Sequence, residues 1–156
     1  MLAIDVPGFK ELRLEYLVLD YNGTLACHGQ LLAGVREKLA ALAPHLEIHI
    51  LTADTFGMAQ DQVAHLPVRL IVLPPGKQAQ AKCDHVRRLG GERTAALGNG
   101  RNDRLMLAEA VLGICVLLEE GVAVETLTAA QVVAPGILAA LDLLLVPNSL
   151  KATLRD

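Results

Sequence analysis

The sequence predicts an α/β fold in which a parallel sheet lies between two layers of helices, formed as one domain over residues 1–156. Short runs of Val, Ile, Leu and Ala recur along the chain without polar alternation, as in parallel strands covered on both faces. Helix-like segments separate these runs, and repeated strand–helix alternation builds parallel sheets with right-handed crossovers. The chain is long enough to bury one sizeable core, and its 53% hydrophobic content suits a largely buried sheet.

The predicted elements alternate in chain order. Strands are expected at 17–19, 48–51, 70–73, 95–97 and 113–116. Helices are expected near 33–43, 56–64, 78–89, 103–110, 121–128 and 136–145. Turn residues interrupt the alternation at Pro74-Pro75-Gly76 and at Gly98-Asn99-Gly100. A further short strand near 2–6 is expected to add to the edge of the sheet.

Charge and aromatic content argue against nucleic acid as a partner. The net charge is −3 at pH 7 with histidine neutral, and no basic run is dense enough to indicate a nucleic-acid-binding patch. Aromatic residues make up only 3% of the chain, which leaves no stacking platform for bases. We therefore expect no nucleic-acid partner.

Cysteine usage and apolar patterning predict a cytoplasmic location. Cys27, Cys83 and Cys115 are odd in number and far apart, so they suit neither a metal motif nor a disulfide framework. Residues 1–15 mix charges into apolar positions, unlike a signal peptide. The apolar stretch 137–146 is too short to span a bilayer and contains an aspartate, so no membrane association is expected.

Polar residues gather where three of the predicted strands end. Open α/β sheets bind their ligands beyond the carboxyl ends of the strands. The three clusters are DYNGT at 20–24, TADT at 52–55 and GNGRND at 98–103. We expect all three to face one crevice.

Asp20 has a structural and a functional interpretation. A lone aspartate after a strand commonly caps a helix or forms an Asx-turn. Alternatively, it is a nucleophile or metal ligand held rigid by the strand behind it. Gly23 would then let the loop pass close to a ligand, and Thr24 would offer a hydroxyl group.

Thr52 and Lys82 are ambiguous taken singly. Thr52 is either a satisfied loop hydroxyl or a hydrogen-bond donor to phosphate, aided by the backbone N–H groups that follow it. Lys82 shares a helical stripe with Val86 and Leu89, so it is either a snorkelling surface lysine or it reaches past the core towards an anion. Lys77 lies roughly 140° around the same helix and is not expected to face the same crevice.

The cluster at 98–103 contains a second carboxylate. Asn102 or Asp103 can cap the following helix. In the functional interpretation, Asp103 lies opposite Asp20 and the two share a divalent cation, because facing carboxylates repel unless a cation offsets them. Hard oxygen ligands favour Mg²⁺. Taken together, Asp20, Thr52, Lys82 and Asp103 supply what phosphoryl transfer to a carboxylate requires.

On these residues the chain resembles the haloacid dehalogenase (HAD) superfamily of phosphohydrolases. DYNGTLA is similar to its first motif, Asp-x-Asp-Gly-Thr, and ILTADT to its second, a strand ending in Thr or Ser. KCDHVRRLG, beginning at Lys82, is similar to its third motif and GNGRND to its fourth. The likeness runs from about residue 14 to the C-terminus and is greatest to the soluble P-type ATPase-like phosphatases. It implies a three-layer Rossmann-like sheet.

The resemblance also implies a role for each matched residue. Asp20 would become aspartyl-phosphate, and the backbone carbonyl of Asn22 would ligate Mg²⁺. Asp103 would be the carboxylate of the metal site, with Asn99 near it. Phosphate would contact Thr24, Thr52, Ala53, Lys82 and Asn102.

Two departures from the family pattern predict slow turnover. Most phosphatases of the superfamily carry an acid/base aspartate where this chain has Asn22, and an acidic residue where it has Asn99. Losing positioned proton transfer forfeits a factor of about 10² to 10⁴. The alternative is a catalytically impaired regulatory or binding protein that binds phosphate, Mg²⁺ or a partner without turnover.

The spacing of the motifs leaves no room for a cap domain. Only a short flap at about 25–32 and one helix fit between Thr24 and Thr52, and one helix and one strand fit between Thr55 and Lys82. A capless site is open, so a large substrate or a neighbouring subunit must exclude water. The expected substrate is a phosphorylated small molecule or a phosphoprotein, and a homo-oligomer is a further prediction.

Two other readings of the motif order are disfavoured. Receiver domains of two-component signalling also use Asp, Thr and Lys at strand ends. Their phosphoacceptor follows the third strand, however, and an acidic pair follows the first, which does not match this order. A full ion pump is not expected, because the chain lacks a membrane segment and room for a nucleotide domain.

Overall fold

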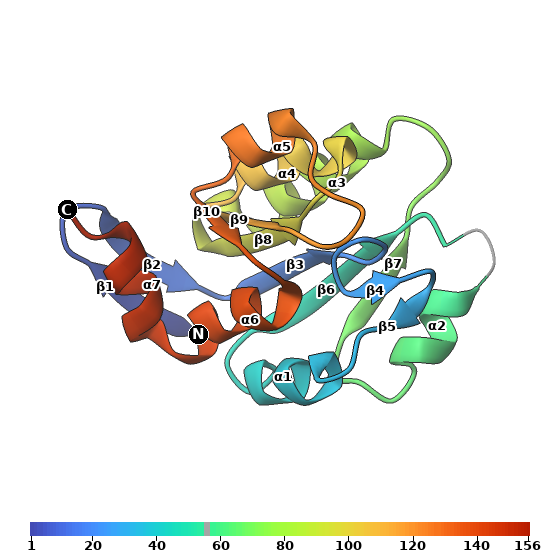
Figure 1. The fold of residues 1–156 in the computed structure, drawn as a ribbon, viewed down its shortest axis with the longest axis horizontal. Helices are drawn as coiled ribbons and strands as arrows, with labels where there is room; N and C mark the ends of the chain where they lie inside the picture. The colour runs from blue at the N-terminus through green and yellow to red at the C-terminus, as the bar shows by residue number, and fades with distance from the viewer. Residues whose placement is uncertain (55–56) are drawn as a thin grey trace.

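A six-stranded parallel sheet forms the centre of the computed structural model, which describes residues 1–54 and 57–156 (Figure 1). The strand order is β10–β9–β8–β3–β6–β7. The bounds are β3 Tyr16–Asp20, β6 Glu47–Thr52, β7 Arg69–Val72, β8 Thr94–Gly98, β9 Leu112–Val116 and β10 Val132–Ala134. All five strands expected from the apolar runs are confirmed, with β3 and β8 paired at the centre.

Burial explains why five strands were visible in the sequence and the sixth was not. Every residue of β8 and of β9 is buried, as expected for strands with helices on both faces. By contrast, β10 has three residues and exposes the middle one at the sheet edge. So short a segment has no distinct apolar pattern of its own.

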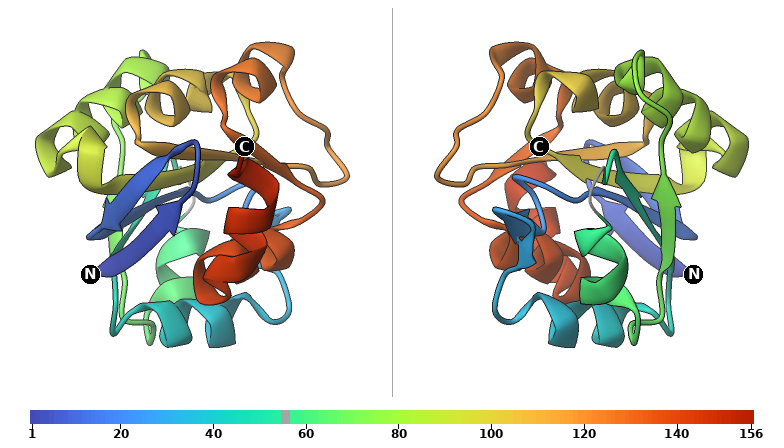
Figure 2. Two further views of the ribbon diagram at one scale, coloured as in Figure 1. Left: turned by 90° about the vertical axis from the view of Figure 1, so that its left-hand side faces the viewer. Right: turned by 90° about the vertical axis from the view of Figure 1, so that its right-hand side faces the viewer.

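Helices cover both faces of the sheet and complete three layers (Figure 2). One face packs against α1 (Val35–Leu42), α2 (Met58–Val63) and α6 (Ile137–Leu145). The other face packs against α3 (Gln78–Leu89), α4 (Arg104–Glu109) and α5 (Val124–Ala129). Single-turn 3₁₀ helices at Gly91–Arg93 and Arg101–Asp103 precede β8 and α4. The expected helix near 56–64 is observed from Met58, and residue 56 lies outside the described residues.

The strand expected near residues 2–6 is confirmed, but it does not join the edge of the main sheet, so that part of the prediction is wrong. β1 (Leu2–Val6) pairs antiparallel with β2 (Lys10–Leu14) in a separate two-stranded sheet. Both strands alternate buried and exposed residues, which suits a hairpin with one covered face. Helix α7 (Pro147–Leu154) contacts β1, and the hairpin and α7 lie at one end of the molecule (Figure 1).

The segments that follow the first two motifs are short. Between β3 and β6 lie the hairpin of β4 (Ala26–Cys27) with β5 (Gln30–Leu31) and helix α1. Between β6 and α3 lie α2 and β7. These elements match the expected flap, helix and strand, and the described residues of these segments contain no further element.

Within the described ranges, no single helix is both long and apolar enough to cross a bilayer. Only α6 and α7, which meet at a bend of 101°, reach the required length and composition as a pair.

Candidate active site

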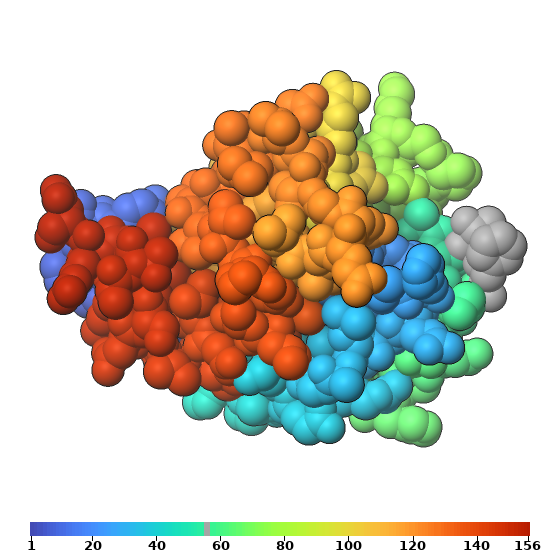
Figure 3. All heavy atoms as spheres, in the orientation of Figure 1, coloured from blue at the N-terminus to red at the C-terminus, as the bar shows by residue number. Residues whose placement is uncertain are grey.

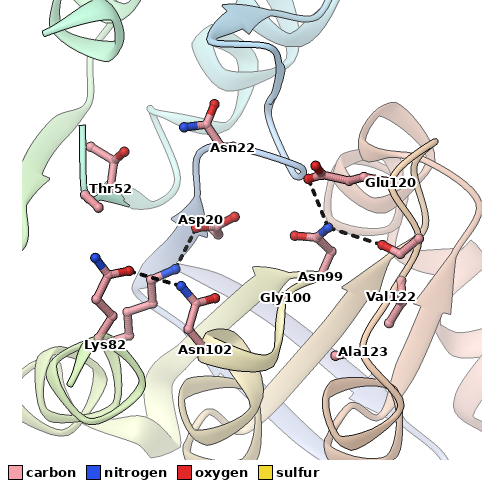
Figure 4. Close-up of a pocket in the computed structure, with 13 residues that line it drawn as sticks. Asp20, Asn22, Thr52, Lys82, Asn99, Gly100, Asn102, Glu120, Val122 and Ala123 are labelled. Atoms are coloured by element: carbon pink, nitrogen blue, oxygen red, sulfur yellow. Dashed lines mark hydrogen bonds and ion pairs between the residues drawn. The ribbon is translucent and has the colours of Figure 1, made fainter. Parts of the chain in front are cut away.

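A pocket of about 650 Å³ opens where the central strands end (Figure 4). The ends of β3 and β6, the turn after β8, the start of α3 and the loop after β9 all line it. The lining residues are Asp20, Asn22, Thr52, Ala53, Gln78, Lys82, Asn99, Gly100, Asn102, Glu120, Gly121, Val122 and Ala123. Three clusters that are far apart in the sequence therefore meet at one edge of the sheet.

Asp20 is held rigid by the strand that precedes it. It is the last residue of β3, whose three preceding residues are fully buried. The chain then turns tightly, because the backbone N–H groups of Thr24, Leu25 and Ala26 all donate to the carbonyl oxygen of Tyr21. The abrupt break after the strand thus fixes one carboxylate at the floor of the pocket.

Lys82 connects the two buried carboxylates of the site. Its ammonium nitrogen lies 2.6 Å from Oδ1 of Asp20 and 2.6 Å from Oδ1 of Asp103. The side chain is 1% exposed, so it is not a snorkelling surface lysine. Burial alone would lower the pKa of Lys82, but attraction to the two carboxylates outweighs burial and the pKa is raised.

The buried position of Asp20 disfavours the charged form of its carboxyl group. Burial, followed by repulsion from Asp103, raises the pKa of Asp20 to about 7, although Lys82 and Thr24 partly oppose the shift. An additional cation close to Asp20 would therefore stabilise its carboxylate form. Strong pKa perturbation in a pocket is typical of functional sites.

Asp103 lies opposite Asp20 as expected, since both carboxylates contact Lys82, but it is buried beneath the pocket. It is fully buried and is not among the lining residues. Its Oδ2 accepts the backbone N–H groups of Asn99 and Gly100 at 2.9 Å each, and its Oδ1 contacts Lys82. A Cβ at Gly98 would lie 2.5 Å from this carboxyl carbon, so the turn needs glycine there. The cation that Asp20 and Asp103 share in this structure is the Lys82 ammonium.

Thr24 lies behind the nucleophile candidate and not on the pocket wall. Its hydroxyl is fully buried and donates to Oδ2 of Asp20 at 3.1 Å. The same oxygen is 3.4 Å from Oδ1 of Asn99. A contact between Thr24 and phosphate stays a prediction, and in the structure the Thr24 hydroxyl is placed to orient the carboxylate of Asp20.

The remaining expected residues do line the pocket. Oγ1 of Thr52 accepts the backbone N–H of Asp54 at 3.1 Å, which fixes the turn that carries Ala53. Nδ2 of Asn102 donates to Oε1 of Gln78 at 3.1 Å, so the turn at residues 98–103 is connected to the start of α3. Thr55, part of the expected cluster, lies outside the described residues.

Sequence reasoning missed the wall formed by residues 120–123. These residues follow β9, whose carboxyl end lies at the same edge of the sheet as the other motifs. The polar residues that follow this strand could have been found by the same rule that selected Asp20 and Thr52. No motif marks them, and Gln78 at the start of α3 was missed for the same reason.

The donor set suits a hard cation. Oδ2 of Asp20 and Oδ1 of Asn99 both approach the Thr24 hydroxyl, and Asn22 lines the pocket beside them. Carboxylate, amide and backbone carbonyl oxygens are ligands for Mg²⁺, which usually keeps several waters. Within the part of the chain that the structure describes, no group of three or more His, Cys, Asp or Glu side chains is arranged for a metal.

The fold is that of the HAD superfamily hydrolases. A putative HAD superfamily (subfamily III A) hydrolase from Legionella pneumophila superposes with a TM-score of 0.71 at 15% identity, covering 90% of this chain and 86% of that one. The 3-deoxy-D-manno-octulosonate 8-phosphate phosphatase from Moraxella catarrhalis, solved in complex with magnesium ion, phosphate ion and a KDO molecule, gives a TM-score of 0.65 at 18% identity, covering 85% of this chain and 86% of that one. A putative phosphatase of the same kind from Vibrio cholerae gives 0.70 at 16% identity, covering 100% and 99%.

Sequence comparison finds archaeal relatives. The uncharacterized protein MJ0073 of Methanocaldococcus jannaschii is 49% identical over 65 residues, which cover 42% of this chain and 70% of that protein. The uncharacterized protein MJ0072 of the same organism is 49% identical over 39 residues, covering 25% and 89%. The chain belongs to one family with these two proteins. No family model matches the sequence.

Proposed function

We propose that the protein is a Mg²⁺-dependent phosphohydrolase that works through an aspartyl-phosphate on Asp20. The observation that carries the proposal is the buried Asp20–Lys82–Asp103 cluster at the floor of an open pocket. A nucleophile, an ammonium group and an amide-rich wall converge there, as phosphoryl transfer requires. The phosphatases with the same fold support the proposal.

In the proposed reaction, a carboxylate oxygen of Asp20 attacks the phosphorus atom of the substrate. The oxygen–phosphorus bond to Asp20 forms as the bond to the leaving oxygen breaks, and the leaving group takes up a proton. Water then cleaves the acyl phosphate, which releases phosphate and restores the carboxylate. Bound Mg²⁺ would neutralise charge on the phosphoryl oxygens, held by the oxygens of Asp20 and Asn99 and by the Asn22 backbone carbonyl.

The side chains around Asp20 have separate proposed roles. Lys82 attracts phosphoryl oxygens, and Asp103 holds Lys82 in place through its 2.6 Å contact. Thr24 orients Asp20 through its 3.1 Å hydrogen bond. Thr52 and Asn102 line the side of the pocket where phosphate oxygens would lie. In this proposal Asp103 acts through Lys82 and not as a metal ligand.

Asn22 makes the second step slow. It lines the pocket where a general acid and base is needed, and its amide neither gives nor accepts a proton usefully. We therefore propose that phosphorylated Asp20 accumulates during turnover. The same observation favours a second candidate function, a regulatory protein whose Asp20 becomes phosphorylated or binds phosphate without turnover.

Phosphate release from p-nitrophenyl phosphate tests the proposal. We expect release that requires Mg²⁺, stops with EDTA and falls at least about 10³-fold in Asp20→Asn, because the nucleophile is lost. Asp5→Asn removes the same charge from an exposed strand residue and serves as the control, with an unchanged rate. Mg²⁺-dependent phosphate binding without release would favour the regulatory candidate, and activity retained in Asp20→Asn would refute the mechanism.

The substrate class follows from the shape of the site. The pocket is open, and the elements after β3 and β6 are too short to cover it with a second domain. A phosphorylated small molecule or a phosphoprotein would fit this description, and a neighbouring copy of the chain could close the site. The particular likeness to soluble P-type ATPase-like phosphatases stays a prediction from the sequence motifs.

A further inference from the structure

Glu120 places a carboxylate at the rim of the pocket that the motifs do not account for. It belongs to the loop between β9 and α5, and the neighbouring Gly121, Val122 and Ala123 also line the pocket. Figure 3 shows the loop after β9, drawn in orange, beside the β4–β5 hairpin, drawn in blue. Residues of the loop and of the hairpin line a shared surface groove, which supports that placement.

The contacts of Glu120 lead to the side chain of Asn99. Nδ2 of Asn99 donates to the backbone carbonyl of Gly121 at 3.2 Å and to Oε1 of Glu120 at 3.4 Å (Figure 4). Both amide protons are therefore directed at the loop. Because the two ends of an amide differ in hydrogen-bonding character, this pairing determines which way Asn99 faces.

The oxygen of Asn99 consequently points into the site. Oδ1 lies 3.4 Å from Oγ1 of Thr24, which in turn donates to Oδ2 of Asp20 at 3.1 Å. With the opposite orientation, the NH₂ group would face the cation position and repel a metal. The loop after β9 thus selects the orientation in which a neutral asparagine can act as a ligand.

Gly23 makes the approach of Glu120 possible. A Cβ built on Gly23 would lie 1.6 Å from Oε1 of Glu120 and 2.7 Å from Nδ2 of Asn99. The backbone there has φ of +79°, a conformation that side-chain-bearing residues rarely adopt. Glycine in the first motif therefore leaves space for a carboxylate that comes from a distant loop.

Glu120 also has no cation of its own. Among residues 1–54 and 57–156, no ion pair of Glu120 is present, and its side chain accepts a hydrogen bond from Asn99. The charges of Asp20 and Asp103 are already shared with Lys82. An unpaired carboxylate beside the Asn99 amide supplies negative charge where residue 99 has none.

We propose that Glu120 is a positioning residue of the metal site: it orients the Asn99 oxygen towards the cation and supplies the negative charge that Asn99 lacks. The inference rests on the proposed function and deepens it. It also accounts for asparagine at 99, because an aspartate there would face the Glu120 carboxylate at close range. Residues that hold a metal ligand in place typically change metal affinity by about 10- to 100-fold when they are replaced.

Manganese binding tests the inference independently of turnover. The full-length protein, freed of metal with EDTA and dialysed, is titrated with Mn²⁺, and free Mn²⁺ is measured by electron paramagnetic resonance. We expect Glu120→Ala to weaken binding by about 10-fold or more, because both charge and orientation are lost. Glu120→Gln keeps an acceptor for Asn99 and is expected to lose less.

Glu119→Gln is the matched control. Glu119 precedes Glu120 and is exposed like it, but Glu119 does not line the active-site pocket. The substitution removes the same charge one residue away, so a general effect of net charge would appear in both variants. We expect Mn²⁺ affinity within about 2-fold of wild type for Glu119→Gln.

A second pair of variants tests the link between residues 99 and 120. Asn99→Asp should increase Mn²⁺ affinity at least about 5-fold more in the Glu120→Gln background than in the wild-type background, because the opposing carboxylate is gone. Equal gains in the two backgrounds would overturn the proposed coupling.

The outcomes separate the inference from the function on which it rests. Mn²⁺ binding that is lost in Asp20→Asn but unchanged in both Glu120 variants would overturn the inference alone. Mn²⁺ binding that is unchanged in Asp20→Asn would overturn the proposed metal site and, with it, the role of Glu120. Loss in Asp20→Asn together with the graded loss in the Glu120 variants is the expected result.

Discussion

Two buried polar clusters lie against the same face of α3, and they are built differently. Lys82 points to the pocket and contacts Asp20 and Asp103 at 2.6 Å each. One turn later, His85 contacts His49 on β6, with Nε2 and Nδ1 separated by 2.8 Å. The first cluster consists of charged groups, and the second is joined through imidazole rings.

Hydrogen bonding in the histidine cluster is complete with neutral rings. Nη2 of Arg88 lies 3.2 Å from Nδ1 of His85, and Nε2 of His49 lies 2.9 Å from a carboxylate oxygen of Glu47. If each ring donates through Nε2 and accepts through Nδ1, every contact in the chain is satisfied. Burial, His49 and Arg88 lower the pKa of His85 to about 4, which keeps it neutral.

In the cluster at the pocket, burial and repulsion from Asp103 disfavour the carboxylate form of Asp20 and raise its pKa to about 7, so Lys82 balances this group only in part. The interior of this protein thus accommodates ionisable groups in two ways, by neutralising them or by leaving their charges incompletely balanced. An incompletely balanced site can gain from binding a cation or a phosphoryl group. The histidine cluster, in which every contact is satisfied, would not be stabilised in this way.

The largest expected effect comes from removing the cation of the charged cluster. Lys82→Met leaves two buried carboxylates without a cation, so we expect the free energy of unfolding to fall by about 3–5 kcal/mol near pH 7.5. Urea unfolding followed by circular dichroism in EDTA measures it. Lys77→Met, at the exposed start of the same helix and outside the pocket, is the control and should change stability by less than about 0.5 kcal/mol.

A partial rescue sharpens this prediction. Asp103→Asn added to Lys82→Met removes one of the two uncompensated charges and should recover part of the lost stability. If the free energy of unfolding of Lys82→Met lies within about 1 kcal/mol of the wild-type value, the two contacts of Lys82 do not hold the charged cluster together.

The next effect concerns catalysis at the pocket. Asn22→Asp restores a proton donor and acceptor, so we expect steady-state phosphate release to rise by about 10²-fold. Stopped-flow and steady-state assays with p-nitrophenyl phosphate measure it. Glu47→Gln makes the reverse exchange, carboxylate to amide, in the histidine cluster outside the pocket. It serves as the control and should leave the rate within about 2-fold of wild type. A flat or reduced rate in Asn22→Asp would contradict the role given to Asn22.

A smaller loss is expected in the histidine cluster. His85→Leu removes the donor to Nδ1 of His49 and leaves a buried acceptor unpaired, which costs about 1–3 kcal/mol of unfolding free energy. Urea unfolding measures the change. Phosphatase activity should remain, because the cluster lies outside the pocket. Loss of activity in a folded His85→Leu variant would show that the two clusters are coupled.

The smallest net effect is the pH dependence of stability, because the two clusters oppose each other. The raised pKa of Asp20 stabilises the fold below pH 3.8, and that contribution is lost as pH rises to about 7. The lowered pKa of His85 stabilises the fold above pH 6.5, and that contribution is lost as pH falls to about 4.

Unfolding free energies across pH 4–8 in EDTA separate the two contributions. The difference between wild type and Asp20→Asn should decrease as pH rises from about 4 to 7, whereas the difference between wild type and His85→Leu should decrease as pH falls from about 6.5 to 4. Parallel profiles for wild type and Asp20→Asn would mean that the Asp20 carboxyl does not carry the raised pKa.

Much of the site could be predicted because strand ends are visible in the sequence. Apolar runs located the tips of β3, β6 and β8, and parallel strands bring such tips to one edge. Asp20, Thr52 and Asn99 were therefore placed together correctly. Glu120 was not found, because its role depends on space above Gly23 and on a contact with a residue 21 positions away.

The sequence alone determined the alternation of buried strands and helices, since hydrophobic periodicity is a local property of neighbouring residues. Only the tertiary structure decided which groups the polar side chains contact. The pairing of β1 with β2 and the short strand β10 depended on what packs beside them. Asp103 contacts Lys82 and accepts two backbone N–H groups. Asn99 directs its amide NH₂ group to the loop after β9. Competition for hydrogen bonds among distant residues in a desolvated site fixes such orientations, and no local pattern contains that information.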